Sequence, residues 1–122
     1  MKKLLLVVPF TAVLTACGSD SAEDIAHSYC MNIKEMEFND ARKIALESVV
    51  SNRQAMYEQN KGKYSQLFRS QNCNVTNVEE DGKDRTAYFA GSKLDSVMLE
   101  YSEEEDRYIV VVDAFKADMK LY

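Results

Sequence analysis

The sequence contains few of the residues that build metal, phosphate or nucleic-acid sites. It has no tryptophan, one proline (Pro9), one histidine (His27) and four glycines, none adjacent to another. A single histidine leaves no ligand set for zinc, and isolated glycines do not form a phosphate-binding loop. Acidic residues outnumber basic ones by 20 to 15, whereas nucleic acid and anionic lipid headgroups attract clusters of lysine and arginine. We therefore expect no metal, no cofactor and no nucleic-acid partner.

The sequence also lacks a convincing set of catalytic residues. Catalysis needs a nucleophile, an acid–base group or a metal, placed in a cleft. His27 lies near the start of an expected helix, where a surface or packing role is the ordinary one. The acidic runs at residues 79–81 and 103–106 fall at expected turns, and solvated turn carboxylates are poor general acids. We therefore predict that this protein is not an enzyme.

Long hydrophobic runs are missing as well. An apolar stretch at residues 4–14 follows two lysines, and it is too short to span a bilayer. It ends in Leu14-Thr15-Ala16-Cys17, which resembles the lipobox of bacterial lipoproteins. That resemblance implies cleavage before Cys17 and acylation of its thiol, and Gly18 after it favours the outer membrane. An ordinary secretory leader, cut nearby, is the alternative.

Both interpretations divide the chain into a signal peptide, residues 1–16, and one domain, residues 17–122. They place that domain in the periplasm, in contact with a membrane only through a lipid anchor. If Cys17 carries lipid, Cys30 and Cys73 remain of the three cysteines. In an oxidising compartment we expect these two to form a disulfide. Two buried free thiols are the alternative.

Residues 21–72 are predicted to be helical. Ser21 and Asp24 suggest a capping box, and the first helix should bury a stripe at helical spacing: Ile25, Tyr29, Ile33 and Met36. A second helix should start at Asn39 or Asp40 and stop at Lys61-Gly62, because glycine adopts the left-handed C-terminal position without steric penalty. Residues 64–68 should form one more turn, with Tyr64, Leu67 and Phe68 packed inwards.

The second helix is expected to be apolar around more than half of its surface. The apolar residues in question are Ile44, Ala45, Leu46, Val49, Val50, Ala55, Met56 and Tyr57. Such a helix needs a sheet on one side and another element on the other. That element is either the first helix or a second copy of the chain, so a homodimer is one of the two arrangements expected.

Residues 73–115 change to strand patterns. We expect strands at residues 75–78, 86–90, 94–101 and 108–115, separated by a type I′ turn centred on Asp81-Gly82, a turn at Gly91-Ser92 and an acidic loop at residues 102–106. Residues 108–112 have no polar break, which predicts a central strand or one covered on both faces. Residues 116–122 should prolong that strand or form a short amphipathic segment.

These elements predict an α+β fold with N-terminal helices packed on one face of a four-stranded antiparallel sheet. The element order resembles the cystatin-like and nuclear-transport-factor-like small domains. The acidic turns are the unusual feature. Charged turns often serve only solubility. Alternatively, Glu79, Glu80 and Asp81 form a rigid negative plug that enters a partner's cleft, with Glu80 and Asp81 leading.

Three further polar or aromatic residues close the second helix: Tyr57, Gln59 and Asn60. They either flank the plug or lie in solvent. Taken with the leader, the acidity and the polar turns, the chain resembles small periplasmic immunity proteins that protect bacteria from type VI secretion effectors, lysozyme-like spike effectors among them. The resemblance implies a cognate effector, a peptidoglycan hydrolase, with Glu80 in its substrate cleft and Gln59 bonding at the rim.

Two other classes remain open. One is a pilotin-like or envelope-assembly lipoprotein, which would carry a partner in an apolar groove or along a sheet edge. The other is a cystatin-like domain that binds a small ligand between helix and sheet.

Overall fold

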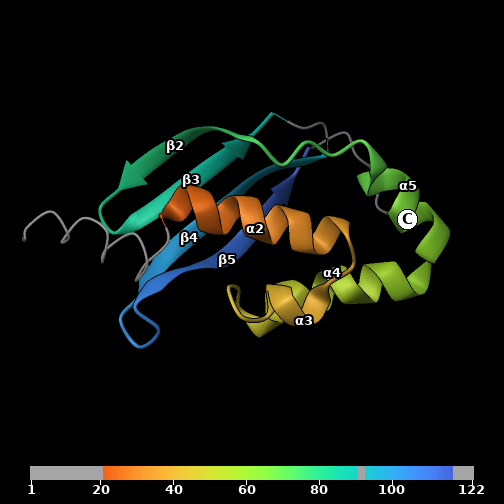
Figure 1. Ribbon diagram of the computed structural model, residues 1–122, viewed down its shortest axis with the longest axis horizontal. Coiled ribbons are helices and arrows are strands. Elements are labelled where there is room, and N and C mark those ends of the chain that lie inside the picture. Colours follow the sequence, from red (N-terminus) through yellow and green to blue (C-terminus); the bar gives the residue numbers. More distant parts are fainter. Residues whose placement is uncertain (1–20, 91–92, 117–122) are drawn as a thin grey trace, which may run out of the picture.

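The computed structural model describes residues 21–90 and 93–116, which form a layer of helices over one face of a sheet (Figure 1). The helices are α2 (Ala22–Lys34), α3 (Phe38–Ala41), α4 (Glu47–Gln59) and α5 (Lys61–Arg69). The strands are β2 (Val75–Asp81), β3 (Asp84–Phe89), β4 (Leu94–Ser102) and β5 (Arg107–Phe115). They pair antiparallel in chain order, so the predicted α+β class is confirmed. The leader with Cys17, the turn at Gly91-Ser92 and residues 117–122 lie outside the described residues.

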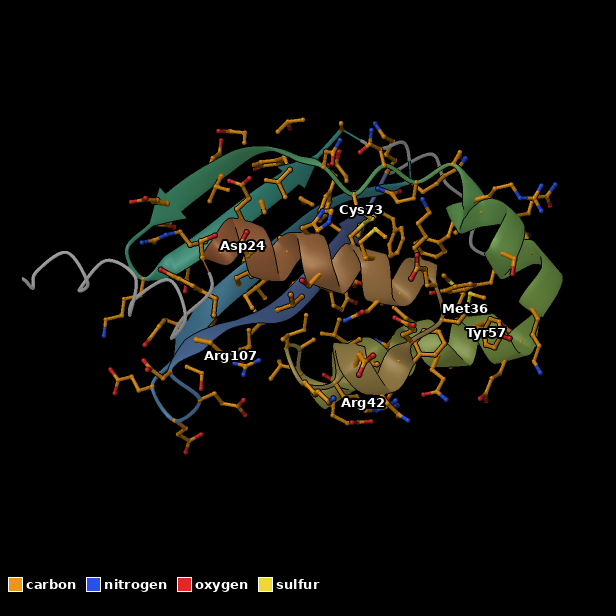
Figure 2. The ribbon with its side chains drawn as sticks, in the orientation of Figure 1. Asp24, Met36, Arg42, Tyr57, Cys73 and Arg107 are labelled. Atoms are coloured by element: carbon orange, nitrogen blue, oxygen red, sulfur yellow. A yellow bond between two sulfur atoms is a disulfide. The ribbon has the colours of Figure 1, made fainter. Side chains whose placement is uncertain are left out.

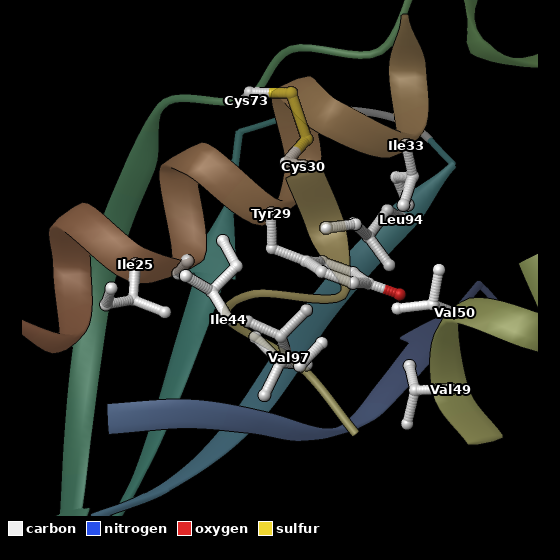
Figure 3. Close-up of a cluster of buried hydrophobic side chains, with 14 of the residues drawn as sticks. Ile25, Tyr29, Cys30, Ile33, Ile44, Val49, Val50, Cys73, Leu94 and Val97 are labelled. Atoms are coloured by element: carbon white, nitrogen blue, oxygen red, sulfur yellow. A yellow bond between two sulfur atoms is a disulfide. The ribbon is translucent and has the colours of Figure 1, made fainter. Parts of the chain in front are cut away.

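Helix α2 forms much as its sequence predicts. The Ser21 hydroxyl accepts a hydrogen bond from the backbone N–H of Asp24 at 3.1 Å, which caps the helix. Ile25, Tyr29 and Ile33 are buried, and Figure 3 shows them directed towards the sheet. Met36 was wrongly assigned to this stripe. It follows the helix with a φ of 61° and is 37% exposed, because the chain reverses direction there.

The second helix does not begin at Asn39 or Asp40. The short helix α3 is followed by a break, and the chain between α3 and α4 lies along the edge of β5. The backbone N–H of Leu46 donates to the carbonyl of Val110 at 3.0 Å, and the N–H of Val110 donates to the carbonyl of Ile44 at 2.9 Å. An edge strand leaves backbone groups that need partners. These hydrogen bonds to β5 stabilise an extended conformation at residues 44–46, although the apolar spacing of this segment fits a helix.

The break narrows the apolar face of α4. Val49, Val50 and Met56 are its buried residues, whereas Ala55 is exposed. Leu46 precedes the helix and is 41% exposed. The wide apolar surface on which the expected homodimer depended is therefore not present on this helix.

The chain between α4 and α5 turns at Asn60, not at Gly62. Asn60 ends α4, and its side-chain oxygen accepts from the N–H of Lys63 at 3.0 Å, so the same residue caps the start of α5. Gly62 lies inside the first turn of α5. The predicted burial of Tyr64 and Phe68 is confirmed.

The first hairpin turn is displaced by one residue from the prediction. Asp81 pairs with Asp84, which leaves Gly82 and Lys83 as the central residues. Gly82 has a φ of 63° and Lys83 does not have positive φ. Glycine at the first central position with positive φ there alone is typical of a type II′ turn, not of type I′.

Strand β5 lies at the edge of the sheet and exposes Val112 on one face, so the prediction of a central strand, or of one covered on both faces, was wrong. Its pairing with β4 skips Val111, because Val110 pairs with Leu99 and Val112 pairs with Met98. This bulge changes which residues face the helices. As a result Val112 is 48% exposed, and Asp113 is turned inwards.

A buried polar cluster joins the helices to this strand. Arg53 Nε of α4 lies 3.2 Å from Asp113 Oδ2, with side chains 12% and 7% exposed. The Tyr29 hydroxyl of α2 donates to the same Asp113 oxygen at 2.8 Å. Burial raises the pKa of the Asp113 carboxyl, and the nearby guanidinium opposes that rise. Burial also raises the pKa of Tyr29, with the Asp113 charge adding to it.

Two further features hold the helices and the sheet together. Cys30 of α2 and Cys73 form a disulfide, with Cα atoms 5.6 Å apart, visible in Figure 3.

The buried side chain of Gln71, which is 1% exposed, connects the chain before β2 to the start of β4. Its side-chain oxygen accepts from the backbone N–H of Leu94 at 2.7 Å and from that of Lys93 at 3.1 Å. This carboxamide satisfies the backbone where β4 begins.

Candidate functional site

The meander brings the two acidic turns to one end of the sheet. Alternate turns of an antiparallel meander lie at the same end, and the β2–β3 and β4–β5 turns are neighbours there (Figure 1). Lys83 Nζ of the first turn lies 3.9 Å from Glu103 Oε2 of the second. Helix α2 also starts at this end, as the position of Asp24 in Figure 2 shows.

We call this surface the acidic end. Its carboxylates are those of Glu23, Asp24, Glu79, Glu80, Asp81, Asp84, Glu103, Glu104, Glu105 and Asp106. Fewer basic residues accompany them: Lys83, Arg85 and Arg107. The end is therefore strongly negative, which suits a basic partner.

The carboxylates predicted to form the plug do not all point the same way. Strand β2 runs as far as Asp81, so Glu79 and Glu80 lie on a strand and face opposite sides of the sheet. Glu79 accepts a hydrogen bond from the Tyr88 hydroxyl at 3.0 Å, which raises the pKa of Tyr88. Glu80 lies on the side of the helices, with a side chain 73% exposed and an oxygen 3.9 Å from Arg85 Nη2.

Arg85 holds the first turn in place, a role that the sequence analysis missed. Its Nη1 donates to the carbonyls of Gly82 and Asp84, both at 2.9 Å. Its guanidinium lies 5.5 Å from the centre of the Tyr108 ring, and its side chain is only 19% exposed. A turn that is hydrogen-bonded to a planar cation, which itself lies over a ring of β5, has little conformational freedom left. The sequence feature that could have indicated this role is the position of Arg85, three residues after Gly82 in the expected turn.

Two tyrosines form an aromatic surface beside this arginine. Tyr101 and Tyr108 face each other across the β4–β5 hairpin, with ring centres 5.4 Å apart and planes at 81°. The Tyr101 hydroxyl donates to Asp106, which raises the pKa of Tyr101. Each tyrosine lies two residues from the acidic run at residues 103–106. This spacing identifies them as a pair only when the register of the hairpin is known.

Two hollows meet at these side chains. One has a volume of about 410 Å³ and is lined by Gly82, Lys83, Arg85, Tyr101, Glu103 and Tyr108. The other, of about 300 Å³, is lined by Ser21, Ala22, Glu23, Val78, Glu80, Arg85 and Tyr108. Because Arg85 and Tyr108 line both hollows, we describe them as one groove, the Tyr101 groove.

The remaining predicted site residues lie elsewhere. Tyr57 is at the far end of the domain from the acidic turns (Figure 2), and Gln59 and Asn60 follow it at the end of α4. The Tyr57 ring is half-buried against Phe38 and Tyr64, 5.8 and 5.4 Å between centres. Of the two alternatives for these residues, the one in which they flank the acidic turns does not hold, because α4 runs away from that end.

The remaining features that could mark a site are His27, a metal-binding cluster and a membrane-spanning helix. His27 Nδ1 lies 2.8 Å from the carbonyl of Cys73, a contact that packs helix α2 against the chain before β2. Within residues 21–90 and 93–116, no group of three or more histidine, cysteine or acidic side chains is arranged to hold a metal. Over the same ranges, every helix is too short or too polar to cross a bilayer.

No family model, curated protein or solved structure matches this chain.

Proposed function

We propose that this protein is a periplasmic immunity protein that binds a peptidoglycan-degrading toxin and inhibits it by docking the acidic end in the toxin's active cleft. The observation that carries the proposal is the convergence of two acidic turns on one rigid sheet end, with Lys83 and Glu103 3.9 Å apart between them. A stiff turn loses little conformational entropy on docking. Complementary charge then speeds association with a basic enzyme and disfavours other partners.

Glu80 is the leading residue in this proposal. Its carboxylate is 73% exposed and lies at the rim of the Tyr101 groove, so a partner reaches it without rearranging the hairpin. Asp81 ends the strand beside it. Gln59 lies at the other end of the domain, so a partner that contacts both must extend along the domain's length. The two positions are therefore tested separately.

The proposed lipid anchor would lie at the same end as the proposed binding site. Ser21, the first described residue, lines the Tyr101 groove together with Glu80. Three residues separate it from Cys17, so the four Cα–Cα steps between Cys17 and Ser21 reach about 14 Å at full extension. An anchored form therefore holds the acidic end against the bilayer, which obstructs a bulky partner. We expect residues 18–122, exported behind an ordinary cleavable secretory leader and therefore without Cys17, to inhibit a soluble hydrolase better than the anchored form.

The test uses protein purified from bacteria that export the full chain, mixed with a panel of peptidoglycan hydrolases that includes lysozyme-like enzymes. We expect potent inhibition of at least one, weakened about tenfold or more by Glu80→Ala, the range of an interface hot spot. Glu35→Ala is the matched control, since that exposed carboxylate lies at the other end of α2. Gln59→Ala reports on the far end. Absence of inhibition across the panel, or equal effects of the two glutamate variants, contradicts the proposal.

One observation favours a second function, that of an envelope-assembly carrier. The sheet face opposite the helices exposes Met98 and Val112, which pair across β4 and β5 and are 39% and 48% exposed. In a carrier, these two adjacent apolar side chains would contact the partner. Met98→Lys should abolish partner capture if the carrier function holds, and should leave hydrolase inhibition unchanged if the acidic end is the site.

A further inference from the structure

The Tyr101 groove combines an aromatic wall with carboxylate rims, which is the arrangement that holds a cation. Tyr101 is 38% exposed and lines the larger hollow with Glu103. Aromatic faces attract guanidinium groups within about 6 Å of the ring centre, and Arg85 already stacks on Tyr108 at 5.5 Å. We infer that the groove receives an arginine side chain from a basic protein partner, which stacks on Tyr101 and pairs with Glu103.

The charges around the groove select a cation over an anion. Arg85 is the innermost positive group, but its Nη1 donates to two backbone carbonyls and its Nη2 faces Glu80 at 3.9 Å. It is therefore engaged within its own hairpin. The carboxylates of the acidic end surround the opening, so an approaching anion is repelled and an approaching guanidinium is attracted.

Lys83 occupies the place that the incoming arginine takes. Its Nζ lies 3.9 Å from Glu103 Oε2 across the mouth of the groove, and the two side chains are 85% and 83% exposed. Such an exposed pair is weak. A guanidinium binds a carboxylate through two parallel hydrogen bonds and lies flat on a ring, whereas an ammonium group is a point charge without that planar geometry. An arginine therefore displaces Lys83, and removing Lys83 strengthens binding.

This inference deepens the proposed function, because the groove lies beside Glu80 and an inhibited enzyme would supply the arginine. It nevertheless makes a claim about a single side-chain site that can be measured without any enzyme.

The experiment is an NMR titration of isotope-labelled protein with the peptide acetyl-Gly-Arg-Gly-amide. We expect saturable shifts at the amides of Gly82, Lys83, Tyr101 and Tyr108. The lysine peptide should bind more weakly, and the citrulline peptide, which keeps the shape without the charge, should not saturate. Shifts that spread over the whole acidic end without saturation, or equal binding of all three peptides, overturn the inference.

Variants locate the site. Lys83→Gln should bind the arginine peptide about threefold more tightly, and Glu103→Gln should weaken it about as much. Glu105→Gln, with the same charge change in the same turn, is the matched control and should be neutral. Tyr101→Leu should abolish saturable binding. If Tyr101→Leu does not fold, the variants at the exposed residues Lys83 and Glu103 still test the site. Equal effects of Glu103→Gln and Glu105→Gln on peptide binding overturn it.

Failures of the two proposals are distinguishable. Saturable arginine binding without inhibition of any hydrolase supports the site and contradicts the proposed function. Inhibition that depends on Glu80, combined with no saturable arginine binding, contradicts the site and supports docking through the acidic end as a whole.

Discussion

Replacing Arg53 with methionine tests whether the buried ion pair holds helix α4 on the sheet. Arg53 Nε lies 3.2 Å from Asp113 Oδ2, and both side chains are nearly buried. Removing one partner of a buried pair leaves an uncompensated charge and costs about 3–5 kcal/mol. The Tyr29 hydroxyl still donates to Asp113 at 2.8 Å. We therefore expect R53M to lower the free energy of unfolding by about 3 kcal/mol at neutral pH, the lower end of that range.

The loss of unfolding free energy in R53M should increase as the pH rises. Burial raises the pKa of Asp113 and Arg53 opposes the rise, so the pKa of Asp113 is higher still in R53M. A raised folded-state pKa means that deprotonation destabilises the fold. The stability deficit of R53M is therefore smallest at acidic pH, where Asp113 is protonated in both proteins. It grows as the pH rises through the folded-state pKa.

Urea unfolding followed by tyrosine fluorescence and circular dichroism measures both effects, since the chain has no tryptophan. The double variant R53M/D113L removes both charges, and we expect it to be more stable than the sum of its single variants by about 2 kcal/mol. K43M is the matched control, because Lys43 pairs with Asp40 at the surface, with side chains 73% and 55% exposed. A deficit of R53M below about 1 kcal/mol, or one that stays constant with pH, refutes the reasoning.

Three further predictions concern stability. Replacing Cys30 and Cys73 with alanine opens a loop of 43 residues and should lower the free energy of unfolding by about 4 kcal/mol; an unchanged urea midpoint contradicts this. Gln71→Leu leaves the backbone N–H of Leu94 without its acceptor and should cost about 2 kcal/mol, with faster amide exchange at Leu94, whereas unaltered exchange speaks against it. Gly82→Ala should cost about 1 kcal/mol because φ is 63° there. An added Cβ meets no atom within 4 Å, so D-alanine at the same position should restore stability, and failure to do so assigns the loss to another cause.

Local patterns in the sequence were enough to predict most elements. The helical spacing of Ile25, Tyr29 and Ile33 predicted the buried face of α2, because a helix repeats every 3.6 residues whatever surrounds it. Alternation predicted the strands in the same way, and counting cysteines predicted the disulfide between Cys30 and Cys73. These predictions are confirmed because each depends on neighbours in the chain or on the number of cysteines.

The errors arose where a distant segment decided the local structure. Ile44 and Leu46 fit a helix by spacing, but the free edge of β5 draws them into pairing with Val110. Asp113 belongs to the exposed face by simple alternation, and the bulge at Val111 turns it inwards. Neither the edge nor the bulge has a signature within its own segment.

In the candidate site, too, some features follow from local sequence and others depend on distant segments. Acidity, the two turns and the prominence of Glu80 follow from residue types and turn chemistry, which act over a few residues. The groove itself depends on tertiary structure, because strand register places Tyr101 opposite Tyr108, and the meander brings Arg85 beside them. Those residues come from three strands, so only the pairing of whole strands, which depends on non-local hydrogen bonds and core packing, makes them neighbours.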